Sequence, residues 1–200
     1  MSNRIIVATG NEHKMIEIRQ ILEGTGLEAV SMKQAGIECD IVEDGSTFEE
    51  NAAIKARAVA EASGEMALSD DSGLVIDALN GEPGIHSARF MGYDTSYDIK
   101  NQYLIDQLKG LPDEKRAARF VCAMVCAFPD GRTITVSETM EGIIGREITG
   151  ANGFGYDPIL YLPEFGCSSA ELSPEQKNEI SHRGKALRKM RMRLMEEGII

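Results

Sequence analysis

A chain of 200 residues, of which 42% are hydrophobic and 26% are charged, has the composition of an ordinary globular protein. Its length suits one large domain with room for two lobes. The formal net charge of −11 argues against general binding to nucleic acid or to an anionic membrane, because such a protein repels phosphates on average. No apolar run of about 18 residues is present, and Met1-Ser2-Asn3 leads into a short strand rather than a signal peptide. We therefore expect a cytoplasmic protein without a membrane span.

The four cysteines, Cys39, Cys122, Cys126 and Cys167, show neither a C-x-x-C spacing nor a neighbouring series of histidines. Zinc sites and disulfide-rich scaffolds carry such patterns. We expect neither kind of site, and we interpret the cysteines as buried thiols.

The first predicted element is a strand, because Arg4 to Ala8 is rich in β-branched residues. Thr9-Gly10-Asn11 then forms a polar turn, and apolar residues at helical spacing up to Leu22 predict a helix. Such a junction offers free backbone N–H groups and the positive end of a helix dipole to an anion, and Lys14 adds a cation. The segment therefore suits a phosphate, although an ordinary capped helix start explains the same residues.

A second short strand, Leu27 to Ser31, precedes a loop that carries Glu43. Ser46 or Thr47, with a glutamate three positions later, matches a capping box, so we expect an Ala-rich helix over 51–63 that ends at Gly64. Glu43 lies just before the cap and is a candidate metal ligand. Lys55, about two turns into the helix, is a candidate cation facing the same site. An exposed surface position remains the alternative for both side chains.

Ser69-Asp70-Asp71-Ser72-Gly73 lies between two apolar runs. We therefore expect a strand that ends at the two carboxylates, a turn at Ser72-Gly73, and a new strand from Leu74 to Leu79. Adjacent carboxylates repel unless a cation, a proton or hydrogen bonds compensate them. Their oxygen atoms suit a hard cation such as Mg²⁺. A solvated turn is the alternative interpretation.

Further along the chain, a helix over 96–108 is expected to pack Ile99, Tyr103 and Leu104 inward. Pro129-Asp130-Gly131 separates two apolar runs, 117–128 and 133–140, and this pattern is typical of a hairpin of two long strands. Strands that alternate with helices early in the chain and a long hairpin later predict an α/β fold. Its sheet should be mixed, with helices on its faces.

The last third of the chain contains the glycine-flanked segment Phe154-Gly155-Tyr156-Asp157, whose two rings would offer flat faces for stacking a base. Ser173 followed by proline starts a short helix that carries Lys177, and His182 and Arg183 open the C-terminal helix. Such charge at a helix start is not expected by chance in a protein this acidic. A solvated basic helix is the alternative, because this end of the chain is basic throughout.

Together these segments resemble the inosine/xanthosine triphosphate pyrophosphatases, enzymes that hydrolyse non-standard purine nucleoside triphosphates. The matching segments keep their order and spacing from residue 5 to about residue 187: Ala8 to Lys14, Gly45 to Ala56, Ser69 to Phe90, Gly153 to Pro158, and Ser181 to Gly184. Ser69 and His86 depart from the alanine and the aromatic residue that are usual in the family.

The resemblance implies one catalytic domain over residues 1–200, an elongated mixed sheet with two lobes around a deep nucleotide cleft, and a homodimer. It implies Mg²⁺-dependent cleavage of ITP, dITP or XTP to the monophosphate and pyrophosphate. Asp71 would be the general base and a metal ligand, and Glu43 a second ligand. The triphosphate would be held by Thr9, Gly10, Asn11, Glu12, His13 and Lys14, with Lys55 nearby and Ser72 touching the substrate. The base and sugar would contact Phe154, Gly155, Tyr156, Asp157, Lys177, His182 and Arg183.

The side chains of Lys177 and Arg183 carry only hydrogen-bond donors. If either faces position 6 of the purine, it bonds a keto oxygen but confronts the amino group of adenine. This chemistry favours 6-oxopurines over ATP, whereas rejection of GTP follows only from the resemblance. Two alternatives stay open: a septum-formation-type nucleotide pyrophosphatase, whose Ser-Pro-Arg-Arg start is absent here, and a non-catalytic nucleotide-binding module, which would typically have lost a carboxylate.

Overall fold

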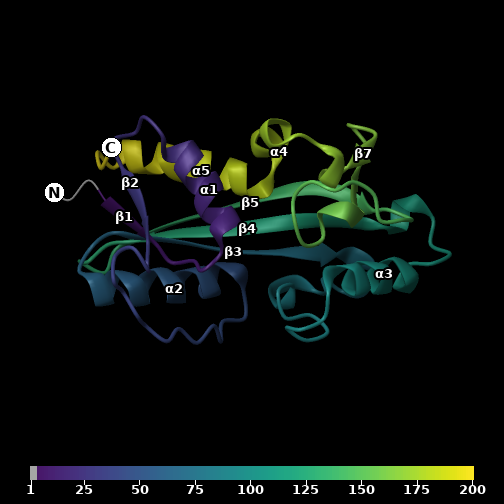
Figure 1. Ribbon diagram of the computed structural model, residues 1–200, viewed down its shortest axis with the longest axis horizontal. Helices are drawn as coiled ribbons and strands as arrows, with labels where there is room; N and C mark the ends of the chain where they lie inside the picture. Colours follow the sequence, from purple (N-terminus) through teal and green to yellow (C-terminus); the bar gives the residue numbers. More distant parts are fainter. Residues whose placement is uncertain (1–3) are drawn as a thin grey trace. The chain divides into compact units, whose positions relative to one another are not determined.

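The computed structural model describes residues 4–200 and contains a seven-stranded sheet with the order β2-β1-β3-β4-β5-β6-β7 (Figure 1). The strands are β1 (Arg4–Val7), β2 (Glu28–Ser31), β3 (Ala67–Ile76), β4 (Ala117–Ala127), β5 (Thr133–Ile144), β6 (Leu160–Leu162) and β7 (Cys167–Ser168). The helices are α1 (Glu12–Leu22), α2 (Phe48–Ser63), α3 (Tyr97–Gln107), α4 (Pro174–Ile180) and α5 (His182–Glu196). β1 pairs in parallel with β2 and β3, whereas β6 pairs antiparallel with β5 and β7. The predicted α/β fold with a mixed sheet is confirmed.

The chain divides into two compact units, both discontinuous in sequence. The first unit comprises residues up to 71, 122–138 and 183–200, and the second comprises 72–121 and 139–182. The strands β3, β4 and β5 therefore contribute residues to both units. The prediction for Met1-Ser2-Asn3, that they lead into the first strand, concerns residues outside the described part of the chain.

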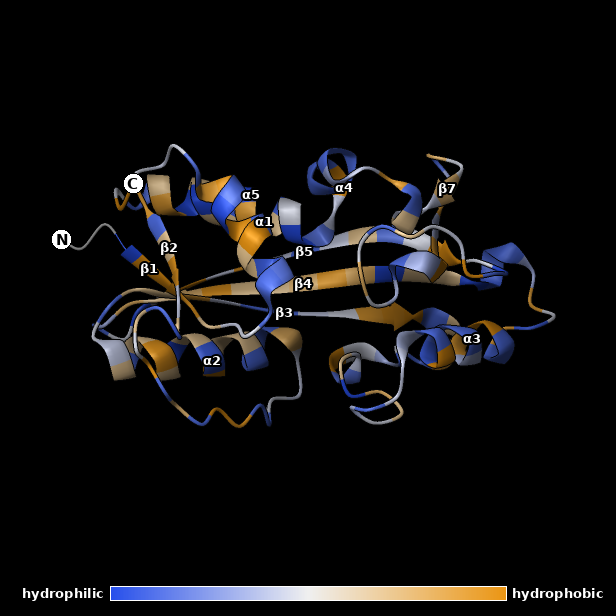
Figure 2. Ribbon diagram, viewed as in Figure 1, coloured by the Kyte–Doolittle hydropathy of each residue, from blue (hydrophilic) through white to orange (hydrophobic). Residues whose placement is uncertain are grey.

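In the first unit, the sheet carries a hydrophobic layer on each face. Side chains alternate along a strand, so Ile5 and Val7 of β1 pack with residues of α1 and α5, whereas Ile6 and Ala8 pack with residues of α2. In Figure 2, β1 and β4 are coloured hydrophobic along most of their length, as strands buried on both faces should be. Helices thus cover both faces of the sheet around β3, the strand that carries Asp70 and Asp71.

Capping residues fix where α1 begins and where α2 begins and ends. Asn11 is the N-cap of α1, and Thr47 is the N-cap of α2, where its hydroxyl accepts a hydrogen bond from the N–H of Glu50 at 3.1 Å. α2 starts three residues earlier than predicted because this cap precedes Phe48. It ends as predicted at Gly64, which has a left-handed backbone (φ 66°).

β3 overturns the prediction of a turn at Ser72-Gly73. A single strand of ten residues runs from Ala67 to Ile76 through both aspartates. Consecutive residues of a strand point to opposite faces, so Asp70 and Asp71 do not confront one another. Each carboxylate also meets its own cation, as described below, which offsets part of their mutual repulsion.

The second unit has one hydrophobic core, in which α3 buries Leu104 as predicted but not the other two predicted residues. Ile99 and Tyr103 are 56% and 41% exposed, so their predicted burial is wrong. The buried residues of α3 are Lys100, Asn101, Leu104 and Ile105. Lys100 is accommodated because its amino group donates to the carbonyl oxygen of Ala88 at 3.1 Å.

The predicted hairpin between β4 and β5 is confirmed, with the N–H of Phe128 donating to the carbonyl of Arg132 across the turn at 3.0 Å. All four cysteines are free thiols, and Cys122 and Cys126 are buried as predicted, whereas Cys39 and Cys167 are half-buried. None of the helices formed by residues 4–200 combines the length and the apolar character needed to cross a membrane.

Candidate active site

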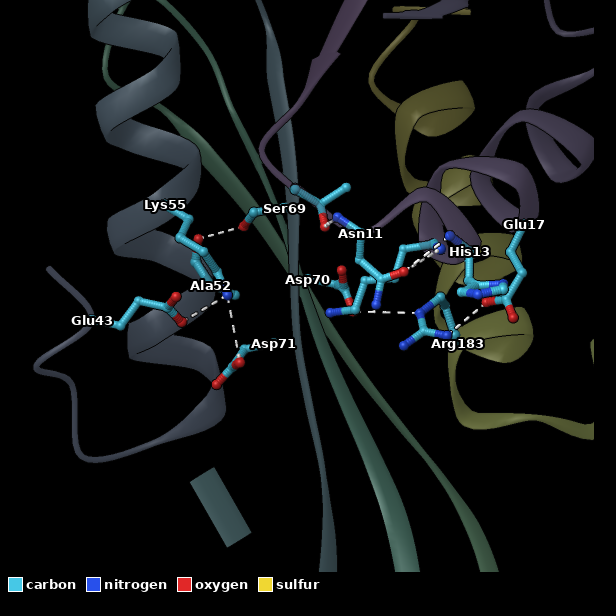
Figure 3. A network of polar contacts seen from close by, with 12 residues as sticks. Asn11, His13, Glu17, Glu43, Ala52, Lys55, Ser69, Asp70, Asp71 and Arg183 are labelled. Carbon is cyan, nitrogen blue, oxygen red and sulfur yellow. Dashed lines mark hydrogen bonds and ion pairs between the residues drawn. The ribbon is translucent and has the colours of Figure 1, made fainter. Parts of the chain in front are cut away.

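Asp70 lies on the face of β3 that α1 and α5 cover, and its side chain is fully buried (Figure 3). Its Oδ2 is 2.8 Å from Nζ of Lys14 and accepts a hydrogen bond from Nε of Arg183 at 3.4 Å. Arg183 also forms an ion pair with Glu17 at 2.6 Å. Although burial opposes ionisation, Lys14 and Arg183 hold the pKa of Asp70 well below its usual range. We call these four residues the Asp70 cluster.

Asp71 lies on the opposite face of β3, toward α2 (Figure 3). Nζ of Lys55 is 2.8 Å from Oε2 of Glu43 and 3.5 Å from Oδ1 of Asp71. The amide of Asn51 donates to Oδ2 of Asp71 at 3.4 Å. We call Glu43, Asn51, Lys55 and Asp71 the Asp71 cluster.

The electrostatics of the Asp71 cluster suit a base. Burial raises the pKa of Asp71, the negative charges of Glu43 and Asp70 raise it further, and the nearby Lys55 and Lys14 offset these effects only in part. The pKa of Lys55 is also raised, because Asp71 and Glu43 outweigh the opposing effect of its own burial. Lys55 therefore stays charged, while Asp71 is more basic than an ordinary aspartate, which suits a carboxylate that takes a proton.

The Asp71 cluster also fits a hard divalent cation. Mg²⁺ is commonly held by one or two carboxylates together with water and substrate phosphates, and Glu43 and Asp71 supply two such carboxylates. Within residues 4–200, no group of three His, Cys, Asp or Glu side chains is arranged to hold a metal ion by itself. Asp70 points to the other face of the strand. The residues present therefore suit a cation that shares its ligands with a bound phosphate.

The segment from Thr9 to Lys14 connects β1 to α1 and is held by its own side chains. Asn11 donates its N–H to the hydroxyl of Thr9 at 3.2 Å, and Oδ1 of Asn11 accepts from the N–H groups of His13 and Lys14 at 2.9 and 3.4 Å. Two of the N–H groups that we expected to be free at this junction are therefore used by the Asn11 cap, which is the alternative of a capped helix start. The exposed residues of the segment are Gly10, Glu12 and His13.

In the second unit, a loop folds around the buried carboxylate of Asp157. Its Oδ2 accepts from Nζ of Lys177 at 2.6 Å and from the N–H of Phe154 at 2.8 Å, and its Oδ1 accepts from the hydroxyl of Ser169 at 2.8 Å. Nζ of Lys177 lies 5.4 Å from the centre of the Phe154 ring. Gly153 is required here, because a Cβ would lie 2.3 Å from Asp157 Oδ2. We call Phe154, Asp157, Ser169 and Lys177 the Asp157 cluster.

Two predicted substrate contacts, Tyr156 and His182, are buried in the second unit. Tyr156 donates its hydroxyl to the carbonyl of Ser87 at 2.7 Å, and its ring meets Tyr97 edge-on at 5.2 Å. Tyr156 is only 4% exposed, so the prediction that its ring offers an open face for stacking is wrong. The ring of His182 stacks on Phe120 at 5.0 Å.

The structure groups the predicted site residues within each unit. The first unit brings Lys14 and Arg183 to Asp70, and Lys55 and Glu43 to Asp71, and the second brings Lys177 to Asp157. Gly155 belongs to the same loop as Asp157, and Ser72 lies half-buried in β3 beyond Asp71.

Several residues that contact the predicted site were not singled out in the sequence, among them Glu17, Asn51, Phe120 and Ser169. Two of them carried a signal, since Glu17 follows Lys14 by three positions and Asn51 precedes Lys55 by four, which places each pair on one helix face. Phe120 and Ser169 have no such relation to a predicted residue, and only the fold reveals them.

Lysines beside carboxylates that could hold a hard cation, on a mixed α/β sheet, are typical of proteins that bind phosphorylated ligands. The chain belongs to the Ham1 family, which matches residues 5–193. Membership of this family confirms the resemblance seen in the sequence motifs, and it disfavours the septum-formation alternative.

Relatives and solved structures match the chain over nearly its full length. It is 46% identical over 186 residues to the dITP/XTP pyrophosphatase of Desulforamulus reducens, covering 93% of this chain and 92% of the relative. It is 47% identical over 187 residues to the dITP/XTP pyrophosphatase of Exiguobacterium sibiricum, covering 94% of each. The structure of a HAM1 protein from Coxiella burnetii superposes with a TM-score of 0.89 at 39% identity, covering 96% of this chain and 98% of that one.

Proposed function

We propose that this protein hydrolyses non-standard purine nucleoside triphosphates, namely ITP, dITP and XTP, to the nucleoside monophosphate and pyrophosphate. The observation that carries the proposal is the Asp71 cluster, in which a half-buried carboxylate of raised pKa lies beside a lysine and a second carboxylate. The names of the D. reducens and E. sibiricum relatives support the substrate class.

In the proposed reaction, Asp71 accepts a proton from the water that attacks the α-phosphorus, and pyrophosphate leaves. A positioned base of this kind contributes about 10² to 10⁴ in rate. Lys55 and Lys14 offset the negative charge of the phosphates. Glu43 and Asp71 would hold Mg²⁺, which supplies further charge stabilisation across the phosphate oxygens when bound.

The proposed triphosphate contacts are Thr9 to Lys14, with Ser72 also touching the substrate. Lys14 is the central cation of this set because Asp70 holds its amino group in place at 2.8 Å. A pre-positioned cation binds phosphate without first losing side-chain freedom, so Asp70 contributes to binding through Lys14. Phosphate would replace or share the Asn11 hydrogen bonds at the start of α1.

We propose that the Asp157 cluster recognises the base. Lys177 has three N–H donors, one of which bonds Asp157, and another is assigned to the keto oxygen at position 6. Phe154 offers its ring, and Gly155 and Tyr156 shape the loop. His182 and Arg183 complete the proposed set of base and sugar contacts, with Arg183 held by Glu17 and Asp70.

Further proposals rest on the family rather than on local geometry. Because the family match spans both units, we propose that residues 1–200 act as one catalytic domain. We also propose a homodimer that acts on the nucleotide pool of the cytoplasm. Light scattering at micromolar concentration tests the homodimer, and a monomer mass would contradict it.

Product analysis tests the proposed reaction. ³¹P NMR of ITP incubated with the protein and Mg²⁺ in H₂¹⁸O should show inosine monophosphate and pyrophosphate, with the label in the monophosphate because water attacks the α-phosphorus. Label in pyrophosphate would contradict attack at that atom, and inosine diphosphate with inorganic phosphate would refute the proposal. Asp71→Asn should retain ITP binding and lose about 10² to 10⁴ in turnover.

A further inference from the structure

Asn51 is a buried side chain with contacts to two different parts of the first unit. It lies in the first turn of α2 and is 1% exposed. Its Oδ1 accepts a hydrogen bond from the N–H of Gly45 at 2.9 Å, and its Nδ2 donates to Oδ2 of Asp71 at 3.4 Å. One planar amide therefore connects the loop before α2 to the carboxylate on β3.

The contact with Gly45 is close enough to fix the loop. A Cβ at residue 45 would lie 2.7 Å from Asn51 Oδ1 and 3.0 Å from Asn51 N, so only glycine fits against the amide. Residue 45 is two positions after Glu43, whose carboxylate contacts Lys55 at 2.8 Å. Holding the backbone at residue 45 therefore limits where the Glu43 carboxylate can go.

Lys55 attracts both Glu43 and Asp71, but it cannot set their orientation. Its ammonium is a point charge on a flexible stem with rotatable donors. The Asn51 amide, by contrast, has its oxygen and nitrogen at a fixed separation, and burial holds it in one place. The carboxamide is therefore the rigid part of the Asp71 cluster.

We propose that Asn51 is a positioning residue for hydrolysis, an inference that rests on the proposed function. It orients Asp71 through Oδ2 and fixes the Glu43 loop through Gly45, so that both carboxylates converge at Lys55. Its effect is on turnover, because a misplacement of about 1 Å in a reacting group costs about 10² in rate.

Two variants separate the two contacts. Asn51→Asp keeps an oxygen that accepts from Gly45 but replaces the donor to Asp71 by a repelling oxygen. Asn51→Leu has a similar size and removes both hydrogen bonds. The matched control is Ser69→Ala, because the buried Ser69 hydroxyl donates to the carbonyl of Ala52 and also ties β3 to α2 without touching Asp71.

Steady-state hydrolysis of ITP and hydrogen exchange of residues 43–47 test the proposal. Both Asn51 variants should lose about 10² in kcat, with KM of Asn51→Leu changed less than about threefold, and Ser69→Ala should stay within about threefold in both. Exchange at residues 43–47 should rise about tenfold in Asn51→Leu and stay unchanged in Asn51→Asp. If Asn51→Leu does not fold, Asn51→Asp decides the question by kcat.

Either of two results would overturn the inference: kcat of Asn51→Asp within about threefold of the wild type, or an equal loss in Ser69→Ala, which would show that the β3 and α2 contact in general is responsible. A wild-type protein that leaves ITP intact would instead refute the proposed function and with it any catalytic role for Asn51. The exchange measurement would then show separately whether Asn51 fixes the Glu43 loop.

Discussion

Replacing Asp70 by asparagine removes a negative charge from a place where two cations remain. Lys14 Nζ and Arg183 Nε lie 2.8 and 3.4 Å from Asp70 Oδ2, and the three side chains are 16%, 4% and 0% exposed. Deleting one partner of a buried ion pair costs about 3 to 5 kcal/mol, because the other charge stays uncompensated. Glu17 still compensates Arg183 at 2.6 Å. We therefore expect a loss at the lower end, about 3 kcal/mol of the free energy of unfolding.

Guanidinium unfolding followed by circular dichroism measures this loss, since the chain has no tryptophan to report by fluorescence. The matched control in the same unit is Glu65→Gln, which breaks a surface ion pair with Arg4 (3.0 Å; side chains 27% and 42% exposed). Such pairs contribute about 0 to 1 kcal/mol. Losses in the two variants that agree within about 0.5 kcal/mol would refute the reasoning that Asp70 compensates buried cations.

Three further outcomes are expected. Gly153→Ala, whose new Cβ would lie 2.3 Å from Asp157 Oδ2, should lower the ratio of kcat/KM for ITP over ATP by at least about tenfold; an unchanged ratio would show that the Asp157 cluster does not select the base. A chelator should abolish hydrolysis and added Mg²⁺ should restore it, whereas chelator-resistant turnover would remove Glu43 and Asp71 as metal ligands. Burial raises the pKa of Cys126 to about 12, so iodoacetamide at pH 8 should modify it about 10³-fold more slowly in the folded than in the unfolded chain. The unfolded thiol loses its proton first, so its contribution to stability should fall as pH rises from about 8.5 to 12 and be absent in Cys126→Ala.

Local patterns predicted the helices and most strands because their causes lie within a few residues. The Thr47 cap and the left-handed Gly64 bound α2, and both are readable in the sequence. β3 was predicted wrongly, because Ser72-Gly73 has the chemistry of a turn and the competing interactions come from elsewhere in the chain. β1 pairs with β3 at Ala67 and Leu68, more than 60 residues away, and lysines from two helices compensate the aspartates.

The candidate site follows the same division. Lysines and carboxylates were predicted as candidate cations and metal ligands. Which of them pair with one another was not predicted, because the partners are buried and lie far apart in the sequence. Arg183 and Glu17 are 166 positions apart, so no local pattern relates them. Tyr156 was predicted to offer an open ring, but its side chain points into the core, where its hydroxyl donates a hydrogen bond to the carbonyl of Ser87. The motifs thus predicted the kinds of residue that the structure brings together, but not what each of them contacts.

Selection of the purine base is the property that most directly tests the proposed function. The most direct measurement is kcat/KM for pyrophosphate release from ITP, XTP, GTP and ATP with Mg²⁺, in the wild type and in Lys177→Met. We expect ITP and XTP to exceed ATP by about 10⁴, because an amino group at position 6 leaves the Lys177 donor unpaired. GTP should also be a poor substrate, and Lys177→Met should lose most of the discrimination against ATP. Equal values of kcat/KM for ATP and ITP in the wild type would contradict the account.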